Sequence, residues 1–167
     1  IFKSEDGGGT WEELSGIEHP RVTAVAVSPT DGAVYAGTEP SALFVSRDRG
    51  TTWSELSGLT KHPTRPTWFP GGGGMCLHTI LVDPKNPQRM WVAISAVGVF
   101  RTDDGGESWK VCTTGLPTVP TGMEDNGVGR CVHKMVLDPE RSGVLYMQFH
   151  GGVFKSEDGA DSWTRVS

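Results

Sequence analysis

Hydrophobic and β-branched residues are concentrated in short runs that are separated by glycine, proline and aspartate. Residues 22–27, 77–82 and 132–137 are three such runs. Runs of this length, bounded by turn residues, are typical of β-strands, and none shows the spacing of an amphipathic helix. We therefore predict an all-β protein made of short antiparallel strands, with a turn at residues 83–87 followed by a strand at 90–94.

A motif of the form Ser/Thr-x-Asp-x-Gly-x-Thr/Ser-Trp occurs four times, each time after an apolar pair such as Leu43-Phe44. We expect it to connect two strands, with Asp accepting backbone N–H groups, Gly adopting a positive φ and Trp packing between sheets. Its recurrence favours this structural role over catalysis or metal binding. The fourth copy has Ala160 in place of glycine, so either its turn is distorted or Gly159 takes the strained position. The motif residues are Asp6, Trp11, Asp48, Trp53, Asp104, Trp109, Asp158 and Trp163.

The spacing of the motif predicts a β-propeller. The four tryptophans are separated by 42, 56 and 54 residues, and repeats of roughly 40–50 residues with four strands each are typical of propeller blades. We predict a segment of three complete four-stranded blades, preceded by a half blade. The predicted divisions are 1–16 for the half blade, then 17–57, 58–112 and 113–167 for blades one, two and three.

Two inserts, residues 58–74 and 113–129, join the last strand of one blade to the first strand of the next. In a propeller these connections share a face with the loops between second and third strands, opposite the repeated motif. Long loops on a rigid scaffold often carry function, although they can also be tolerated surface loops. Trp68 and Phe69 in the first insert could stack on a sugar or another flat ligand, or plug the central channel.

The first strands of blades two and three share a Cys-x-His pattern, Cys76 with His78 and Cys131 with His133. Alternation places each Cys and its His on one side of the innermost strand, and His150 approaches the same mouth. Such a set could bind a transition metal. Because the ligands come from different blades, we favour the alternative, in which Cys fills a buried slot and His bonds backbone or water. No metal or other cofactor is expected.

Composition limits the classes of partner. The formal net charge is −5 with the charges scattered, which argues against a nucleic-acid or membrane surface. Three cysteines suggest no disulfide framework, which favours a reducing compartment such as the cytoplasm. The chain begins inside a repeat, so we expect a piece of a longer protein. Its exposed ends would be covered by the remaining blades or by a second copy.

The repeated motif resembles the Asp-box, or BNR repeat, and the whole chain resembles the sialidase-like and WD40/YVTN/BNR-like propellers. More narrowly, residues 68–78 and 95–106 resemble a bacterial group described as exo-α-sialidases or glycosyl hydrolases. Sialidases use an arginine cluster, a Tyr–Glu pair and an Asp acid. Here Tyr35 and Tyr146 both lie inside predicted second strands, and Arg21 and Arg130 do not make an arginine triad.

The xyloglucanase-like members of this superfamily need two carboxylates across a cleft. Glu124 and Asp125 on the second insert are the catalytic candidates by position, together with Glu39 on a blade-one loop. The alternative for each is a solvated loop residue.

Two main functions remain open, beside a purely assembling role. The first is a binding scaffold that presents a carbohydrate or small-molecule pocket on the insert-bearing face. The second is part of a glycoside hydrolase whose catalytic residues lie partly outside these 167 residues. The expected ligand contacts are Trp68, Phe69, His78, Arg130, His133 and His150.

Overall fold

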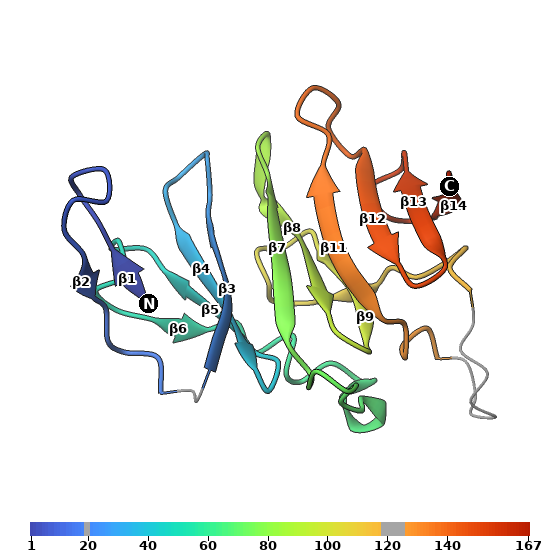
Figure 1. Cartoon of the computed structure of the whole chain (residues 1–167), viewed down its shortest axis with the longest axis horizontal. Coiled ribbons are helices and arrows are strands. Elements are labelled where there is room, and N and C mark those ends of the chain that lie inside the picture. Colours follow the sequence, from blue (N-terminus) through green and yellow to red (C-terminus); the bar gives the residue numbers. More distant parts are fainter. Residues whose placement is uncertain (19–20, 118–125) are drawn as a thin grey trace.

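The computed structural model describes residues 1–18, 21–117 and 126–167. It contains three four-stranded antiparallel sheets and one two-stranded sheet, arranged side by side like the blades of a fan (Figure 1). The prediction of an all-β chain with three complete blades and an N-terminal half blade is confirmed. Within the described residues, no helix combines the length and hydropathy needed to cross a bilayer.

Each sheet is a meander in which neighbouring strands follow one another along the chain. The half blade consists of β1 (Phe2–Lys3) and β2 (Glu12–Glu13). Blade one contains β3 (Arg21–Val27), β4 (Val34–Glu39), β5 (Leu43–Ser46) and β6 (Ser54–Glu55). Blade two contains β7 (Leu77–Asp83), β8 (Asn86–Ile94), β9 (Gly98–Thr102) and β10 (Lys110–Val111), and blade three contains β11 (Val132–Leu137), β12 (Leu145–Phe149), β13 (Gly152–Ser156) and β14 (Thr164–Arg165).

Strand β8 is longer than the sequence predicts. It begins at Asn86 instead of residue 90, because Asp83 pairs with Asn86 around a tight turn and the register shifts before Val82 pairs with Met90. The carboxylate of Asp83 accepts the backbone N–H of Lys85 at 2.9 Å and closes this turn. The predicted turn at 83–87 is therefore shorter, and its last two residues belong to the strand.

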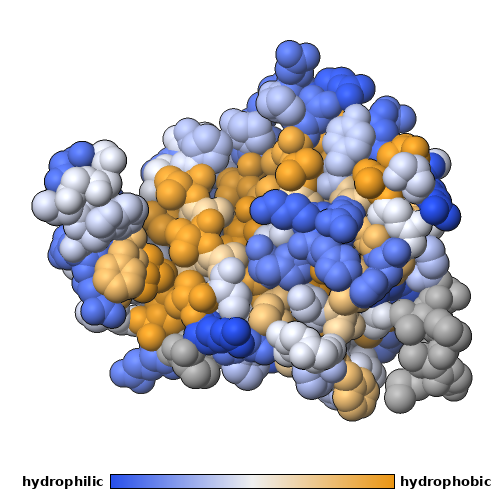
Figure 2. Space-filling model, viewed as in Figure 1, coloured by the Kyte–Doolittle hydropathy of each residue, from blue (hydrophilic) through white to orange (hydrophobic). Residues whose placement is uncertain are grey.

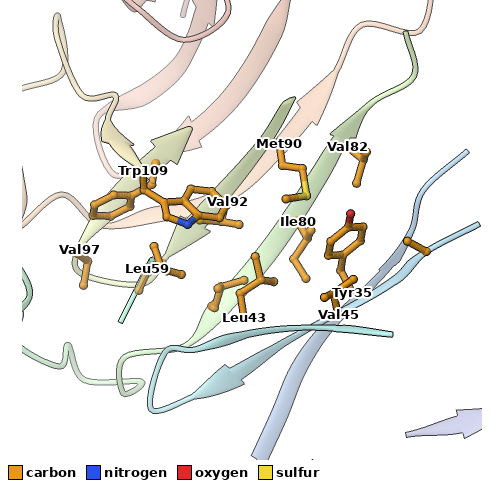
Figure 3. Close-up of a cluster of buried hydrophobic side chains, with 14 of the residues drawn as sticks. Tyr35, Leu43, Val45, Leu59, Ile80, Val82, Met90, Val92, Val97 and Trp109 are labelled. Carbon is orange, nitrogen blue, oxygen red and sulfur yellow. The ribbon is translucent and has the colours of Figure 1, made fainter. Parts of the chain in front are cut away.

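Two apolar clusters join the blades, one on each side of blade two. Figure 3 shows the first, in which side chains of β4 and β5 point toward those of β7 and β8. The second cluster includes Trp91 and Val99 of blade two and Met135, Leu145 and Phe154 of blade three. Since burial of apolar area is the main stabilising term, the contacts between blades contribute much of the stability of the fold.

The innermost strands β3, β7 and β11 lie next to one another, and each has a bulge near its start. The bulged residues are Thr23, His78 and His133. Thr23 Oγ1 donates to the carbonyl of Leu77 at 2.7 Å, and His78 Nε2 lies 2.9 Å from the carbonyl of Val132. Each of these two bulges therefore places a side chain across the boundary to the following blade.

The four repeated motifs have the same internal hydrogen bonds. In the second copy, Ser46 Oγ donates to Asp48 Oδ1 at 2.8 Å and accepts the N–H of Gly50 at 2.7 Å. Asp48 also accepts the N–H and hydroxyl of Thr52, at 2.8 and 2.6 Å. These bonds, led by the one from the Thr52 hydroxyl, lower the pKa of Asp48 to about 2. The aspartate is thus a structural clasp held in its ionised form.

The fourth motif keeps this geometry despite its alanine. Gly159 and Ala160 both have φ of 73°, as the corresponding Arg49 and Gly50 have φ of 60° and 92°. The N–H of Ala160 still donates to Ser156 Oγ at 2.8 Å. The turn is therefore not distorted. Gly159 takes a left-handed conformation as the second alternative expected, and Ala160 adopts one beside it.

The motif tryptophans differ in burial. Trp109 and Trp163 are buried between blades as predicted, whereas Trp11 of the half blade is 64% exposed. Among the described residues, Trp11 is therefore not packed between two sheets. The indole N–H of Trp163 reaches back to the carbonyl of Cys112 in blade two at 2.9 Å. Each buried indole packs toward the preceding blade, and no four-stranded sheet precedes Trp11 among the described residues.

Candidate functional site

The described parts of both inserts lie on the face opposite the motif turns. Arg65 of the first insert donates from Nη1 to the carbonyl of Ser41, between β4 and β5, at 2.9 Å. Gly129 of the second insert donates its N–H to the carbonyl of Val97, between β8 and β9, at 2.9 Å. In Figure 1 the first insert, with its 3-10 helix η1 (Arg65–Thr67), lies at the lower edge and the β1–β2 turn at the upper edge. We call this lower surface the insert-bearing face.

The three blades present structurally equivalent residues on this face. The pairs Val22 with Thr38, Leu77 with Ile94, and Val132 with Phe149 occupy the same register position at the bulge. We call three residues of each blade its inner corner. Two are on the first strand, namely the residue just before this pair and the bulged residue just after it. The third is the residue just after the pair on the second strand. The corners are Arg21, Thr23 and Glu39 in blade one, Cys76, His78 and Ser95 in blade two, and Cys131, His133 and His150 in blade three.

The corner of blade one is an ion pair that supports the first insert. Arg21 Nη1 lies 2.5 Å from Glu39 Oε2. The Glu39 carboxylate covers the Cα of Gly74, where φ is +87° and a Cβ would overlap with the carboxylate oxygen. Burial raises the pKa of the nearby Cys76 thiol, and the Glu39 carboxylate raises this pKa further. Glu39 is therefore a carboxylate fixed in position on the insert-bearing face.

In the corner of blade two, the His78 side chain is occupied by protein contacts. Its Nε2 faces the Val132 carbonyl, and Nδ1 lies 2.9 Å from the hydroxyl of Thr79. Burial lowers the pKa of His78, which favours the neutral ring. Cys76 instead donates to the carbonyl of Gly73 at 3.3 Å. The sequence-based alternative, a histidine that bonds backbone, describes His78.

The corner of blade three differs, because its three side chains come together. The Cys131 sulfur and one ring nitrogen each of His133 and His150 lie within 4.8 Å of one another. The two imidazoles meet edge to face with centroids 4.5 Å apart. Both histidines are exposed and Cys131 is partly buried. The predicted convergence of thiols and imidazoles thus occurs within this single blade, without Cys76 or His78.

The aromatic residues of the first insert have opposite surroundings. Trp68 is 7% exposed and donates its indole N–H to Thr64 Oγ1 at 2.9 Å. Its ring packs 5.0 Å from that of Phe100, with the Arg65 guanidinium 4.7 Å above its centroid. Trp68 is part of the core and leaves little of its ring surface exposed to a ligand. Phe69 is 61% exposed and is available to a ligand.

The remaining predicted residues are distributed as follows. Arg130 is buried and donates to the carbonyl of Val128 at 2.8 Å, so it anchors the second insert and is not a surface contact. Tyr35 is buried in the first apolar cluster, and Tyr146 accepts a bond from Arg141 at 3.3 Å. The catalytic candidates Glu124 and Asp125 lie outside the described residues.

A groove of about 430 Å³ runs between the inner strands. His78 and Thr79 contribute to its wall, together with Lys134 and Val136 of β11 and Val25 of β3. Figure 2 shows this side of the molecule, where an apolar area extends over the region of β3 and β7. The wall offers both apolar surface and polar groups to a ligand.

Reasoning from the sequence missed the pairing of Arg21 with Glu39. The sequence contained a signal, because aligning the blades by their proline turns gives Arg21 the same position as Cys76 and Cys131. Extending that alignment to the end of the second strand gives Glu39 the same position as Ser95 and His150. Only the strand register shows that these positions meet.

Comparison with known proteins agrees with this architecture. Residues 44–55 match the family model of the BNR/Asp-box repeat. The fold aligns with an ancestral GH74 enzyme over 99% of this chain and 21% of that chain, with a TM-score of 0.71 and 22% identity. It also aligns with the Niastella koreensis GH74 enzyme over 87% of this chain and 22% of that one, with a TM-score of 0.60 and 22% identity. The chain is therefore a set of Asp-box β-propeller blades.

A curated relative is similar in sequence as well. The oligoxyloglucan-reducing end-specific xyloglucanase of Emericella nidulans is 26% identical over 89 residues, which are 52% of this chain and 10% of that protein. The chain thus spans a small part of the relatives that it matches. The resemblance to glycosyl hydrolases with BNR repeats is confirmed at the level of fold and repeat, whereas the narrower one to bacterial sialidases stays a prediction.

Proposed function

We propose that this chain is part of a glycoside hydrolase that acts on xyloglucan-type polysaccharides, and that its insert-bearing face forms part of the substrate-binding surface. This is the second of the two functions that the sequence leaves open. The 89-residue similarity to a xyloglucanase carries the proposal, since likeness of fold alone is compatible with many functions.

The insert-bearing face has groups suited to a sugar chain. The exposed ring of Phe69 can stack on the apolar face of a pyranose, and the Arg21–Glu39 pair offers donors and acceptors to hydroxyl groups. Gly74 allows the Glu39 carboxylate to approach the insert backbone. These groups would bind and orient substrate.

Hydrolysis in this class of enzyme needs two carboxyl groups, about 5–5.5 Å apart for retention or about 6.5–9.5 Å for inversion of configuration. Glu39 is the candidate on the described part of the face, and Glu124 and Asp125 are the candidates on the second insert. One carboxylic acid would protonate the glycosidic oxygen while the other, as a carboxylate, activates water or attacks the anomeric carbon.

The test is release of reducing ends from soluble xyloglucan by the full-length protein that contains these residues. Glu39→Gln and Asp125→Asn are the variants, with Glu157→Gln as the matched control because Glu157 lies by the motif turn on the opposite face. We expect the control to keep full activity and at least one variant to lose about 10²-fold or more in kcat.

Three results would contradict the proposal. If xyloglucan in the gel slows the protein in affinity electrophoresis but the protein does not hydrolyse it, the binding scaffold would be supported instead. Cleavage of a sialoside with no action on xyloglucan would support the sialidase resemblance. Absence of both binding and turnover would remove the carbohydrate hypothesis.

A further inference from the structure

The inner corner of blade three gathers three metal-ligating side chains on a rigid support. Cys131 immediately precedes β11, and His133 occupies the bulge of that strand. His150 lies in the tight turn between β12 and β13, where Phe149 pairs with Gly152. Because Val132 pairs directly with Phe149, the strand register keeps the three residues together.

The geometry is close to that of a coordination shell. The three candidate ligand atoms lie within 4.8 Å of one another. In a tetrahedral zinc site, bonds of about 2.0–2.3 Å place neighbouring ligand atoms about 3.3–3.8 Å apart. Small side-chain rotations would bring the present arrangement to that spacing. The exposure of both histidines leaves a fourth position open to water or another ligand.

Blade two provides an internal comparison. It has the same Cys-x-His pattern, yet Ser95 occupies the position of His150. Both ring nitrogens of His78 have protein partners, and the Cys76 thiol bonds to the Gly73 carbonyl. The pattern alone therefore does not make a site. Blade three differs by a second imidazole placed against the first.

We propose that Cys131, His133 and His150 bind a divalent transition metal ion, with Zn²⁺ the ion that this donor set suits best. One thiolate and two imidazoles are a common zinc ligand set, and thiolate disfavours Mg²⁺ and Ca²⁺. Binding releases the thiol proton of Cys131 to solvent and forms a metal–sulfur bond, with no change of oxidation state. None of these three ligands is a carboxylate assigned to the proposed hydrolase.

The experiment is a titration of the chelator-treated, reduced chain with Zn²⁺, and in parallel with Co²⁺ as a spectroscopic substitute. We expect one ion per chain, a thiolate-to-Co²⁺ charge-transfer band, and an increase in the melting temperature with Zn²⁺. Cys131→Ser and His150→Ala should each weaken binding by at least about tenfold, and Cys131→Ser should abolish the charge-transfer band.

Cys76→Ser is the matched control, since Cys76 is the equivalent residue of blade two, and it should leave affinity and spectrum unchanged. The proposal is overturned if the Co²⁺ spectrum has no thiolate band, or if Cys131→Ser and His150→Ala bind like the unmodified chain. Equal loss in Cys76→Ser, or binding only at millimolar Zn²⁺, would overturn it as well. If any of these results is obtained, we would assign His133 the role of Thr23 and His78, whose side chains hydrogen-bond to a backbone carbonyl of the next blade.

Discussion

The two faces of the blades behave differently although both are built from repeats. On the motif face, four copies make the same Ser/Thr–Asp clasp, and even Ala160 adopts the conformation that glycine has elsewhere. On the insert-bearing face, the equivalent inner corners hold an ion pair, a backbone-bonded histidine and a Cys-His-His cluster. The clasp must close every hairpin, so its chemistry is repeated. No hairpin depends on the corner residues for its closure, so their residue types can differ from blade to blade.

The largest effect is expected from the motif tryptophans, and it separates buried from exposed copies. Trp109→Ala should lower the free energy of unfolding by about 3–5 kcal/mol, because it leaves a cavity between blades one and two. Trp11→Ala removes a largely exposed ring and should lower it by less than about 1 kcal/mol. Denaturant unfolding followed by circular dichroism measures both. Equal losses would show that the motif is not a packing device between blades.

A smaller effect is expected at the corners, where His78 and His133 can be compared directly. His78→Ala removes the partner of the buried Val132 carbonyl and should destabilise the chain by about 1–3 kcal/mol. His133→Ala alters an exposed ring and, without metal, should change stability by less than about 0.5 kcal/mol. Unfolding in the presence of a chelator is the measurement. A reversed order would contradict the assignment of His78 as the contact between blades.

The smallest effect per residue is expected from the pH dependence of the motif carboxylates. Hydrogen bonds from Ser108, its hydroxyl first, hold the pKa of Asp104 at about 2, against 3.8 for the unperturbed group. A folded-state pKa below the unfolded value gives stability that is present above pH 4 and is lost as pH falls from about 4 to 2. Solvent screening limits the gain at this exposed site.

The check is the unfolding free energy measured between pH 2 and pH 6. Asp104→Asn should flatten the acid limb of this profile relative to the unmodified chain. Glu107→Gln, which removes a neighbouring exposed carboxylate outside the clasp, should leave it unchanged. An acid limb unaffected by Asp104→Asn would mean that the clasp does not stabilise through its charge.

Much of the site could be predicted from residue types, but their arrangement could not. The pattern predicted that Cys131, His133 and His150 approach one mouth, and the structure brings their ligand atoms within 4.8 Å of one another. It also grouped them with Cys76 and His78, which instead bond to nearby backbone and hydroxyl groups. Trp68 and Phe69 are adjacent and similar in the sequence. Only packing against Phe100 makes Trp68 a core residue while Phe69 remains exposed.

The sequence by itself determined the blades, because strand, turn and clasp are local structures specified by short runs of β-formers and by hydrogen bonds within eight residues. The tertiary structure decided which corner residues meet. Those contacts depend on strand register and on a bulge in each inner strand, which couple residues such as Arg21 and Glu39, or Cys131 and His150, that are 18 and 19 positions apart. A shift of one residue turns a side chain to the other side of the sheet, and no local pattern records that choice.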